Sequence, residues 1–284
     1  MTEVVAVRLT TWRLPYPVAR AAMIGTSRDS LILAGGLLLG DRSTDRVVRV
    51  DPSSGRRKAL PTLAVPVHDT AGGLVGGVPT LVGGGNTTEQ SVVQSLGHGR
   101  WRRAGNLPTA RSDLGVVEWR RHAYVIGGYD GASVPRTILR LSPRAAPHPV
   151  GRLLQGVRYA AMTRIHSDVY VFGGEVAGRE LDTIQQVDLA TGRTRPAGRL
   201  PMPLGHAMAA TIGHRILLMG GRVTPDRQTR DMWWYDPATR RFRSAGRLPS
   251  PLSDAAVSSR GRRVWLLGGE TPAVTARVIE VTLR

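Results

Sequence analysis

The sequence predicts an all-β fold of six similar four-stranded sheets, and three recurring features support this prediction. A short apolar run followed by a Gly-Gly pair occurs six times, and the first glycines of successive pairs are 48, 44, 46, 47 and 48 residues apart. A Gly-x-Leu-Pro tetrad or a close variant ends most repeats, and an apolar residue precedes a turn about 14 residues after each pair. A fixed period of this length indicates that each repeat is one small structural unit.

The apolar runs before the Gly-Gly pairs predict one strand in every repeat. In chain order these runs are residues 31–34, 80–82, 124–126, 170–172, 216–219 and 264–267. The pairs themselves are expected at crowded positions, where a side chain would obstruct a neighbouring strand or loop.

Repeat five shows the remaining strands most clearly. Residues 207–212 follow a Leu-Pro, 215–219 end at the Gly-Gly pair, 232–236 carry a Tyr-Asp-Pro turn, and 241–245 lead to the next Leu-Pro. A single antiparallel sheet of four such strands would leave an apolar face in water, whereas radial packing of several sheets buries these faces. The sequence therefore predicts a six-bladed β-propeller with four-stranded antiparallel blades, in which residues 1–284 form one domain.

The repeats resemble the kelch motif, in which an apolar strand ends in Gly-Gly and is followed by a Tyr and then by a Trp or another aromatic residue. Repeat five matches best, with Gly220-Gly221, Tyr235 and Phe242, and repeat two keeps Trp101 without the Tyr. Repeats one, three and four have aliphatic residues in place of the aromatic pair. The resemblance covers essentially the whole chain and implies a kelch-type propeller, a fold that serves many functions.

The two ends of the sequence predict how the ring closes. The last repeat stops after its third strand, residues 274–283, and the chain begins with an isolated strand, residues 4–9. The segment Trp12-Arg13-Leu14-Pro15 then matches the pattern that follows a fourth strand elsewhere. We therefore expect the N-terminal strand to complete the C-terminal blade.

The charge composition is strongly basic but evenly spread. The net charge is +18, and Lys58 is the only lysine beside 38 arginines, a bias that GC-rich coding alone produces. The arginines are scattered over every repeat, as on solvated strand faces and turns. With 5% aromatic residues, stacking on single-stranded nucleic acid is not expected, so nucleic acid is not an expected partner.

Other features indicate a soluble protein. The segment Met1-Thr2-Glu3 lacks the basic start and apolar run of a signal peptide. The longest apolar stretch, residues 31–40, is about half as long as a membrane helix. We therefore expect a cytoplasmic protein without membrane contact, and a monomer, because closed propellers protect their sheet edges. The chain has no Cys, so no disulfide contributes.

The candidate binding residues lie in two loops of each repeat, the loop before the first strand and the loop after the Gly-Gly pair. Strand polarity places both loops on the face that borders the channel, where propellers commonly bind ligands. Counting back 14 residues from each pair gives the equivalent positions Ala21, Asp69, Asp113, Tyr159, His206 and Asp254. With their neighbours, the ligand-binding candidates are Arg20, His68, Asp69, Arg111, Asp113, Arg158, Tyr159, Glu175, His206, Arg222, Asp254 and Glu270.

Two interpretations of these polar residues remain open from the sequence. They can form a pocket for a small polar ligand or for a polar loop of a protein partner, and the acids with His68 and His206 can bind a divalent cation or act as acid and base. Alternatively, the acids cap backbone N–H groups in tight turns and the arginines pair locally with the acids.

Several specific chemistries lack their motifs. There is no His-x-His or HExxH spacing, no phosphate loop with Lys-Ser/Thr, and no Gly-x-Ser-x-Gly. Some oxidases of the kelch family use copper with a cysteine–tyrosine cross-link, which a chain without Cys cannot form. The cluster Trp233-Trp234-Tyr235 is expected in the core, because alternate side chains of a strand point to opposite faces. No cofactor, no metal and no catalytic residue is predicted.

Three functions are compatible with these residues. The first is a non-enzymatic binding scaffold that uses the channel face, with a protein or a small polar ligand as partner. The second is a propeller enzyme acting on a sugar or sugar acid, by analogy with kelch-type sialic acid mutarotases. The third is a basic module that binds phosphate or polyanions.

Overall fold

The computed structural model describes residues 3–27 and 30–284, and every regular element in this part of the chain is a β-strand. By its contacts the chain divides into two compact units. Unit 1 comprises residues 1–19, 159–190 and 194–284, and unit 2 comprises residues 20–158 and 191–193. Each unit contains three four-stranded antiparallel sheets, which we call blades and number by the order of their Gly-Gly pairs.

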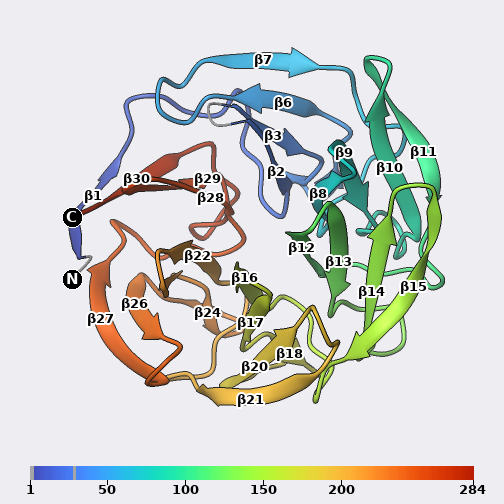
Figure 1. Ribbon diagram of the computed structural model, residues 1–284. Helices are drawn as coiled ribbons and strands as arrows, with labels where there is room; N and C mark the ends of the chain where they lie inside the picture. Colours follow the sequence, from blue (N-terminus) through green and yellow to red (C-terminus); the bar gives the residue numbers. More distant parts are fainter. Residues whose placement is uncertain (1–2, 28–29) are drawn as a thin grey trace. The chain divides into compact units, whose positions relative to one another are not determined.

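Unit 2 holds the first three blades (Figure 1). Blade one consists of β2 (Ala22–Ser27), β3 (Ser30–Ala34), β6 (Val47–Val50) and β7 (Arg57–Leu60). Blade two consists of β8 (Ala71–Val75), β9 (Val78–Val82), β10 (Val92–Gly97) and β11 (Arg100–Asn106). Blade three consists of β12 (Gly115–Trp119), β13 (His122–Ile126), β14 (Thr137–Ser142) and β15 (Ala145–Arg152).

Unit 1 holds the other three blades. Blade four consists of β16 (Ala161–Ile165), β17 (Asp168–Phe172), β20 (Thr183–Asp188) and β21 (Thr194–Arg199). Blade five consists of β22 (Met208–Ile212), β23 (Arg215–Met219), β26 (Asp231–Asp236) and β27 (Arg241–Arg247). Blade six consists of β28 (Ala256–Arg260), β29 (Arg263–Leu267), β30 (Val278–Leu283) and β1 (Val4–Leu9).

Three blades carry a two-stranded hairpin directly after the Gly-Gly pair. These hairpins are β4 (Leu37–Leu38) with β5 (Arg42–Ser43), β18 (Glu175–Val176) with β19 (Arg179–Glu180), and β24 (Arg222–Thr224) with β25 (Arg227–Gln228). They extend the loop that follows the second strand of the blade.

Six four-stranded antiparallel blades confirm the predicted fold class, a six-bladed β-propeller. The predicted closure is also confirmed, because β1 is hydrogen-bonded to β30 and completes blade six. The pairing runs from Val4 opposite Leu283 to Leu9 opposite Ile279. Beyond β1, the backbone N–H of Leu14 donates to the Ala276 carbonyl at 2.9 Å, so the connection into blade one is also fixed to blade six.

The Gly-Gly pairs lie at crowded positions, as predicted. In blade five, Gly221 has φ +106°, and a Cβ atom there would lie 2.7 Å from the Gly205 oxygen and 2.8 Å from the Ala207 Cβ. Side chains are therefore excluded both by the backbone conformation and by the neighbouring loop. The Gly221 N–H donates to the Leu252 carbonyl at 2.8 Å, which holds the pair against the start of blade six.

Within each unit the apolar cores lie between successive blades. In unit 1 one core joins blades four and five and another joins blades five and six. Trp234 is buried in the core shared with blade six, whereas Tyr235 is buried in the core shared with blade four, with Trp233 packed against it. The expectation that this cluster belongs to the core is confirmed. Tyr235 also donates a hydrogen bond from its hydroxyl to the Ala197 carbonyl at 2.6 Å.

Candidate functional site

One residue in each blade, just before the first strand, has a left-handed backbone. These left-handed residues are Arg20, Asp69, Asp113, Tyr159, His206 and Asp254, with φ between 49° and 58°. Five of them are the positions expected from counting back from the Gly-Gly pairs. In blade one the prediction of Ala21 was wrong by one residue, because the β2–β3 hairpin has a register shift between Gly25 and Ser27 and adds a residue to the count.

Backbone hydrogen bonds connect successive left-handed residues within each unit. In unit 2, the N–H of Asp69 donates to the Arg20 carbonyl at 3.0 Å, and the N–H of Asp113 donates to the Asp69 carbonyl at 2.9 Å. In unit 1, the N–H of His206 donates to the Tyr159 carbonyl at 2.8 Å, and the N–H of Asp254 donates to the His206 carbonyl at 3.1 Å. The positions of these residues are therefore fixed by main-chain contacts that do not depend on the side chain.

A second backbone contact places the residue after the Gly-Gly pair beside the left-handed residue. In blade five, Gly205 and Arg222 exchange two hydrogen bonds of 2.9 and 2.7 Å, and in blade six Ser253 and Glu270 exchange two of 3.1 and 2.9 Å. Blades two and three have the same bridge, at His68 with Gly85 and Ser112 with Tyr129. In these four blades the prediction that the two loops lie on the same face is confirmed.

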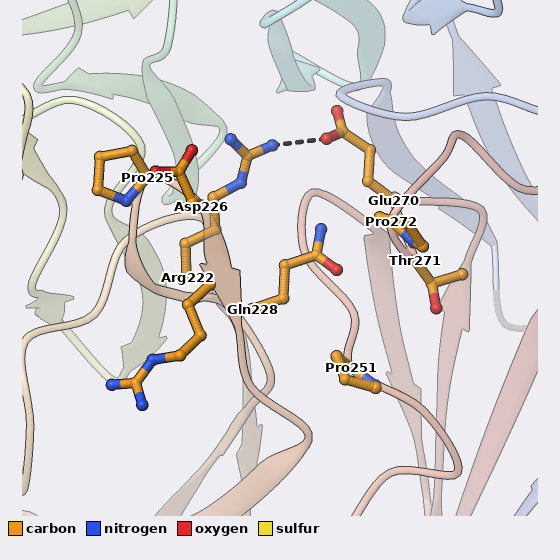
Figure 2. Close-up of a pocket in the computed structure, with 9 residues that line it drawn as sticks. Arg222, Pro225, Asp226, Gln228, Pro251, Glu270, Thr271 and Pro272 are labelled. Carbon is orange, nitrogen blue, oxygen red and sulfur yellow. Dashed lines mark hydrogen bonds and ion pairs between the residues drawn. The ribbon is translucent and has the colours of Figure 1, made fainter.

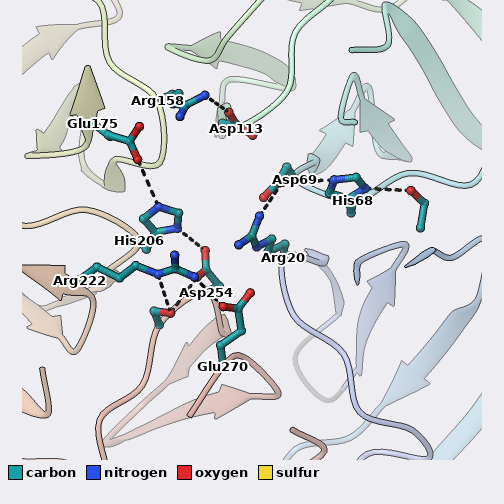
Figure 3. A network of polar contacts seen from close by, with 12 residues as sticks. Arg20, His68, Asp69, Asp113, Arg158, Glu175, His206, Arg222, Asp254 and Glu270 are labelled. Atoms are coloured by element: carbon teal, nitrogen blue, oxygen red, sulfur yellow. Dashed lines mark hydrogen bonds and ion pairs between the residues drawn. The ribbon is translucent and has the colours of Figure 1, made fainter. Parts of the chain in front are cut away.

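In unit 1 the two loops build a polar network around His206 (Figure 3). The His206 Nδ1 atom lies 2.7 Å from Asp254 Oδ1, and its Nε2 atom lies 3.7 Å from Glu175 Oε2. Tyr159 stacks on the imidazole with a centroid distance of 3.8 Å and an interplanar angle of 22°. The His206 side chain is only 4% exposed, so blades four, five and six all contribute to a buried polar contact.

His206 carries a positive charge at neutral pH. Burial by itself lowers the pKa of the imidazole, but the carboxylates of Asp254 and Glu175 outweigh this effect and raise the pKa to about 9. Arg222 opposes the rise, because a second cation nearby disfavours protonation. With both ring nitrogens facing carboxylates, the imidazolium is suited to holding the two acids in place.

Arg222 extends the network toward blade six and reaches an open cleft. Its Nη2 atom lies 3.2 Å from Asp254 Oδ2 and 2.5 Å from Glu270 Oε2. Arg222 and Glu270 also line a cleft of about 490 Å³ between the β24–β25 hairpin and the loop after β29 (Figure 2). Gln228, Thr271 and Pro272 lie along the same cleft. The ion pair therefore links the buried network to a cleft large enough for a side chain or a small molecule.

Unit 2 has a second network, centred on Asp69 (Figure 3). The Asp69 carboxylate lies 3.2 Å from the Arg20 guanidinium and 3.5 Å from His68 Nε2, while His68 Nδ1 is 2.8 Å from the Ser43 hydroxyl. Burial, followed by the positive charge of Arg20, lowers the pKa of His68. His68 is therefore neutral where His206 is charged, although the two residues occupy neighbouring positions in their repeats.

Two further candidates of unit 2 form a separate pair. Arg158 Nη1 lies 3.6 Å from Asp113 Oδ2, and the Arg158 guanidinium lies over the Tyr129 ring at 5.1 Å from its centroid. The structure does not bring Arg111 into either network. Its side chain is buried and donates to the Thr137 carbonyl at 2.8 Å, so it holds the β13–β14 connection instead.

The structure adds residues to the site that sequence reasoning missed. Ser43 contacts His68, Ser253 donates to Asp254 Oδ2 at 2.8 Å, and Gln228 donates to the Ser253 hydroxyl at 3.0 Å. Ser253 directly precedes a left-handed residue, as His68 does, and this spacing is a signal that could have identified it. Ser43 and Gln228 lie in the short hairpins, which no repeat marker predicts.

The interpretation that arginines pair locally with the acids agrees with the contacts of Arg20, Arg158 and Arg222. Within residues 3–27 and 30–284, no three His, Asp or Glu side chains are grouped as a metal site requires. The same residues contain no helix with the length and apolar character needed to cross a membrane.

Comparisons with known proteins agree with this architecture. Residues 203–249, which span blade five, match the family model described as the Kelch motif. The chain is similar to Kelch-like protein 25 of Homo sapiens, with 25% identity over 203 residues, which is 65% of this chain and 34% of the human protein. It is also similar to Kelch repeat protein M-T8 of Myxoma virus (strain Lausanne), with 26% identity over 202 residues, which is 65% of this chain and 38% of the viral protein. The match spans little more than a third of the length of these relatives.

The blades and their loops define the chain as a β-propeller whose polar side chains are presented by two loops of each repeat. The kelch motif matched in blade five, the similarity to kelch proteins and the six four-stranded blades together support the predicted kelch-repeat propeller. The aromatic pair implied by the resemblance is present in this blade, where Tyr235 and Phe242 lie opposite each other in the sheet with ring centroids 5.0 Å apart.

Proposed function

We propose that this chain is a non-enzymatic binding scaffold that engages a partner protein with the loops before the first strands and after the Gly-Gly pairs. The observation that carries the proposal is the Arg222–Glu270 ion pair at the edge of the cleft. Arg222 also pairs with Asp254, which in turn contacts the buried His206 cation. Polar groups that are fixed before binding lose little conformational entropy on binding. Kelch-repeat propellers generally mediate protein interactions, which also supports this function.

The contacts of His206 favour binding over proton transfer. A general acid or base must reach the substrate with a free nitrogen. Both nitrogens of His206 face carboxylates of the protein, and the ring is covered by Tyr159. The sugar-acid enzyme therefore remains the second candidate, with Arg222 as the group that would contact a substrate carboxylate.

The test compares two double variants of blades five and six, each of which removes one positive and one negative charge and so keeps the net charge. In the site variant, Arg222→Gln with Glu270→Gln removes the ion pair at the cleft. In the matched control, Arg247→Gln with Asp231→Asn removes an exposed ion pair of 3.0 Å on the outer side of blade five. Each protein is immobilised, captured proteins are identified by mass spectrometry, and the affinity of each captured protein is then measured with purified components.

We expect a partner whose affinity for the site variant is about tenfold weaker, as for a central residue of an interface, and unchanged for the control. A set of partners that binds all three proteins equally would contradict the proposal. A thermal shift with sialic acid that disappears in the site variant would instead favour the sugar-acid enzyme.

A further inference from the structure

A second open surface lies in unit 2, between blades two and three. It is a groove of about 960 Å³ that runs between the β8–β9 turn at Gly76 and the β14–β15 turn at Pro143. These two turns are in close contact, because a Cβ atom at Gly76 would lie 2.6 Å from the Pro143 Cγ. The Gly76 N–H donates to the Arg121 carbonyl at 2.8 Å, and the Arg121 guanidinium donates back to the Gly76 carbonyl at 2.9 Å. The two turns and Arg121 are thus held together at the groove.

The floor of the groove is apolar. Val75, Val78, Val93 and Leu141 line it, and Val78 is 41% exposed although it lies in a strand. An apolar side chain placed here would cover surface that the folded chain leaves in water. The groove therefore suits a ligand with at least one apolar side chain.

The edge of the groove is cationic. Arg121 and Arg144 line it, and no Asp or Glu side chain is among its lining residues. Ser95, which also lines the groove, lies directly opposite Arg102 in the β10–β11 pair. Because opposite residues of an antiparallel pair project from the same face, the exposed Arg102 side chain is on the groove side of blade two. Arg100, two residues earlier, projects from the same face.

The nearby carboxylate of Glu118 is held by the backbone of blade two. Its Oε1 atom accepts a hydrogen bond from the Leu74 N–H at 2.7 Å, and its side chain packs against Gly73 between the blades.

We propose that this groove binds an acidic segment of a partner protein, a short extended peptide in which apolar and carboxylate side chains alternate. Alternation matches the groove because successive side chains of an extended peptide point to opposite sides. The apolar side chains then cover Val78 and its neighbours, and the carboxylates face the guanidinium groups of Arg102, Arg121 and Arg144. This surface is distinct from the cleft at Arg222 and binds a different part of a partner.

The experiment measures binding of a fluorescent peptide of alternating Glu and Leu by anisotropy. A peptide with Gln in place of Glu tests the charge, and a peptide of Glu and Gly tests the apolar side chains. We expect the Glu–Leu peptide to bind, the binding to weaken with added salt, and both control peptides to bind at least about fivefold more weakly.

Two kinds of protein variant test the groove itself. One changes the exposed residue Val78, and the other compares Arg102 with the equivalent Arg243 of blade five. Val78→Asp and Val78→Lys remove the same apolar side chain but introduce opposite charges, so Asp should weaken binding at least about fivefold relative to Lys. Arg102→Gln should also weaken binding, whereas Arg243→Gln should not, because Arg243 occupies the same place in β27 of blade five. Equal affinity of the two Val78 variants, equal loss in the Arg243 variant, or displacement of the peptide by a DNA oligonucleotide in an Arg102-dependent manner would overturn the proposal.

Discussion

At the scale of single residues, backbone and side chain contribute separately to the site. The left-handed residues are arginine, aspartate, tyrosine and histidine, yet they share one backbone conformation and successive main-chain hydrogen bonds. Aspartate tolerates this conformation through its short polar side chain, whereas tyrosine and arginine are strained there. The fold therefore keeps the geometry constant while the chemistry of each position changes.

The ion pairs of His206 should contribute strongly to stability. Replacing His206→Asn keeps a residue that tolerates the left-handed backbone but removes the cation between Asp254 and Glu175. Because the buried carboxylates of Asp254 and Glu175 both lose the cation between them, we expect the free energy of unfolding to fall by about 3 kcal/mol. Urea denaturation measures this value, and the exposed residue His214 provides the control, where His214→Asn should change stability by less than about 0.5 kcal/mol.

The charge of His206 also predicts a pH dependence. Its folded pKa of about 9 lies above the ordinary value of 6.5, so folding favours the protonated form. The stabilisation is fully present below pH 6.5 and is lost as the pH rises through about 9. The difference in unfolding free energy between wild type and His206→Asn should shrink by about 3 kcal/mol over this range. A difference that stays constant would show that His206 is neutral in the folded protein.

At the scale of elements, the Gly-Gly pair of blade five joins this blade to the start of blade six. We expect Gly221→Ala to lower the free energy of unfolding by about 3 kcal/mol, because the Cβ meets the Gly205 oxygen and the backbone has φ +106°. Gly213→Ala is the matched control, since Gly213 has φ +61° and open space around its Cβ position. There only the backbone cost of about 1 kcal/mol applies. Equal losses at the two positions, measured by chemical denaturation, would refute the packing role.

The strands could be predicted because their pattern is local. The segment Arg215–Met219 was predicted with its observed bounds, since an apolar run between a turn and a glycine pair leaves little choice of register. The contacts of the site could not be predicted in the same way. Arg111 and Arg158 both lie close before a first strand, yet one side chain turns inward to the Thr137 carbonyl and the other pairs with Asp113. That choice depends on packing between blades, which the sequence of one repeat does not contain.

At the scale of the whole molecule, the sheet shared by the two ends of the chain should control stability. Val7 lies opposite Val281 and packs against the core between blades five and six, whereas Val5 is 55% exposed. We expect Val7→Asp to destabilise the protein by about 2 kcal/mol, because it places a carboxylate against the core. Val5→Asp should change stability by less than about 0.5 kcal/mol. Thermal melting of the two variants measures the difference, and similar melting temperatures would show that β1 contributes little.

The pairing of β1 with β30 also affects how the protein folds during synthesis. The first strand leaves the ribosome long before its partner, because 268 residues separate Leu9 from Val278. Until β30 has been synthesised, the open edge of β1 has no partner within its own sheet and is exposed to other nascent chains. The sixth blade is thus the last to assemble, and premature termination anywhere upstream of β30 leaves its first-made strand unpaired.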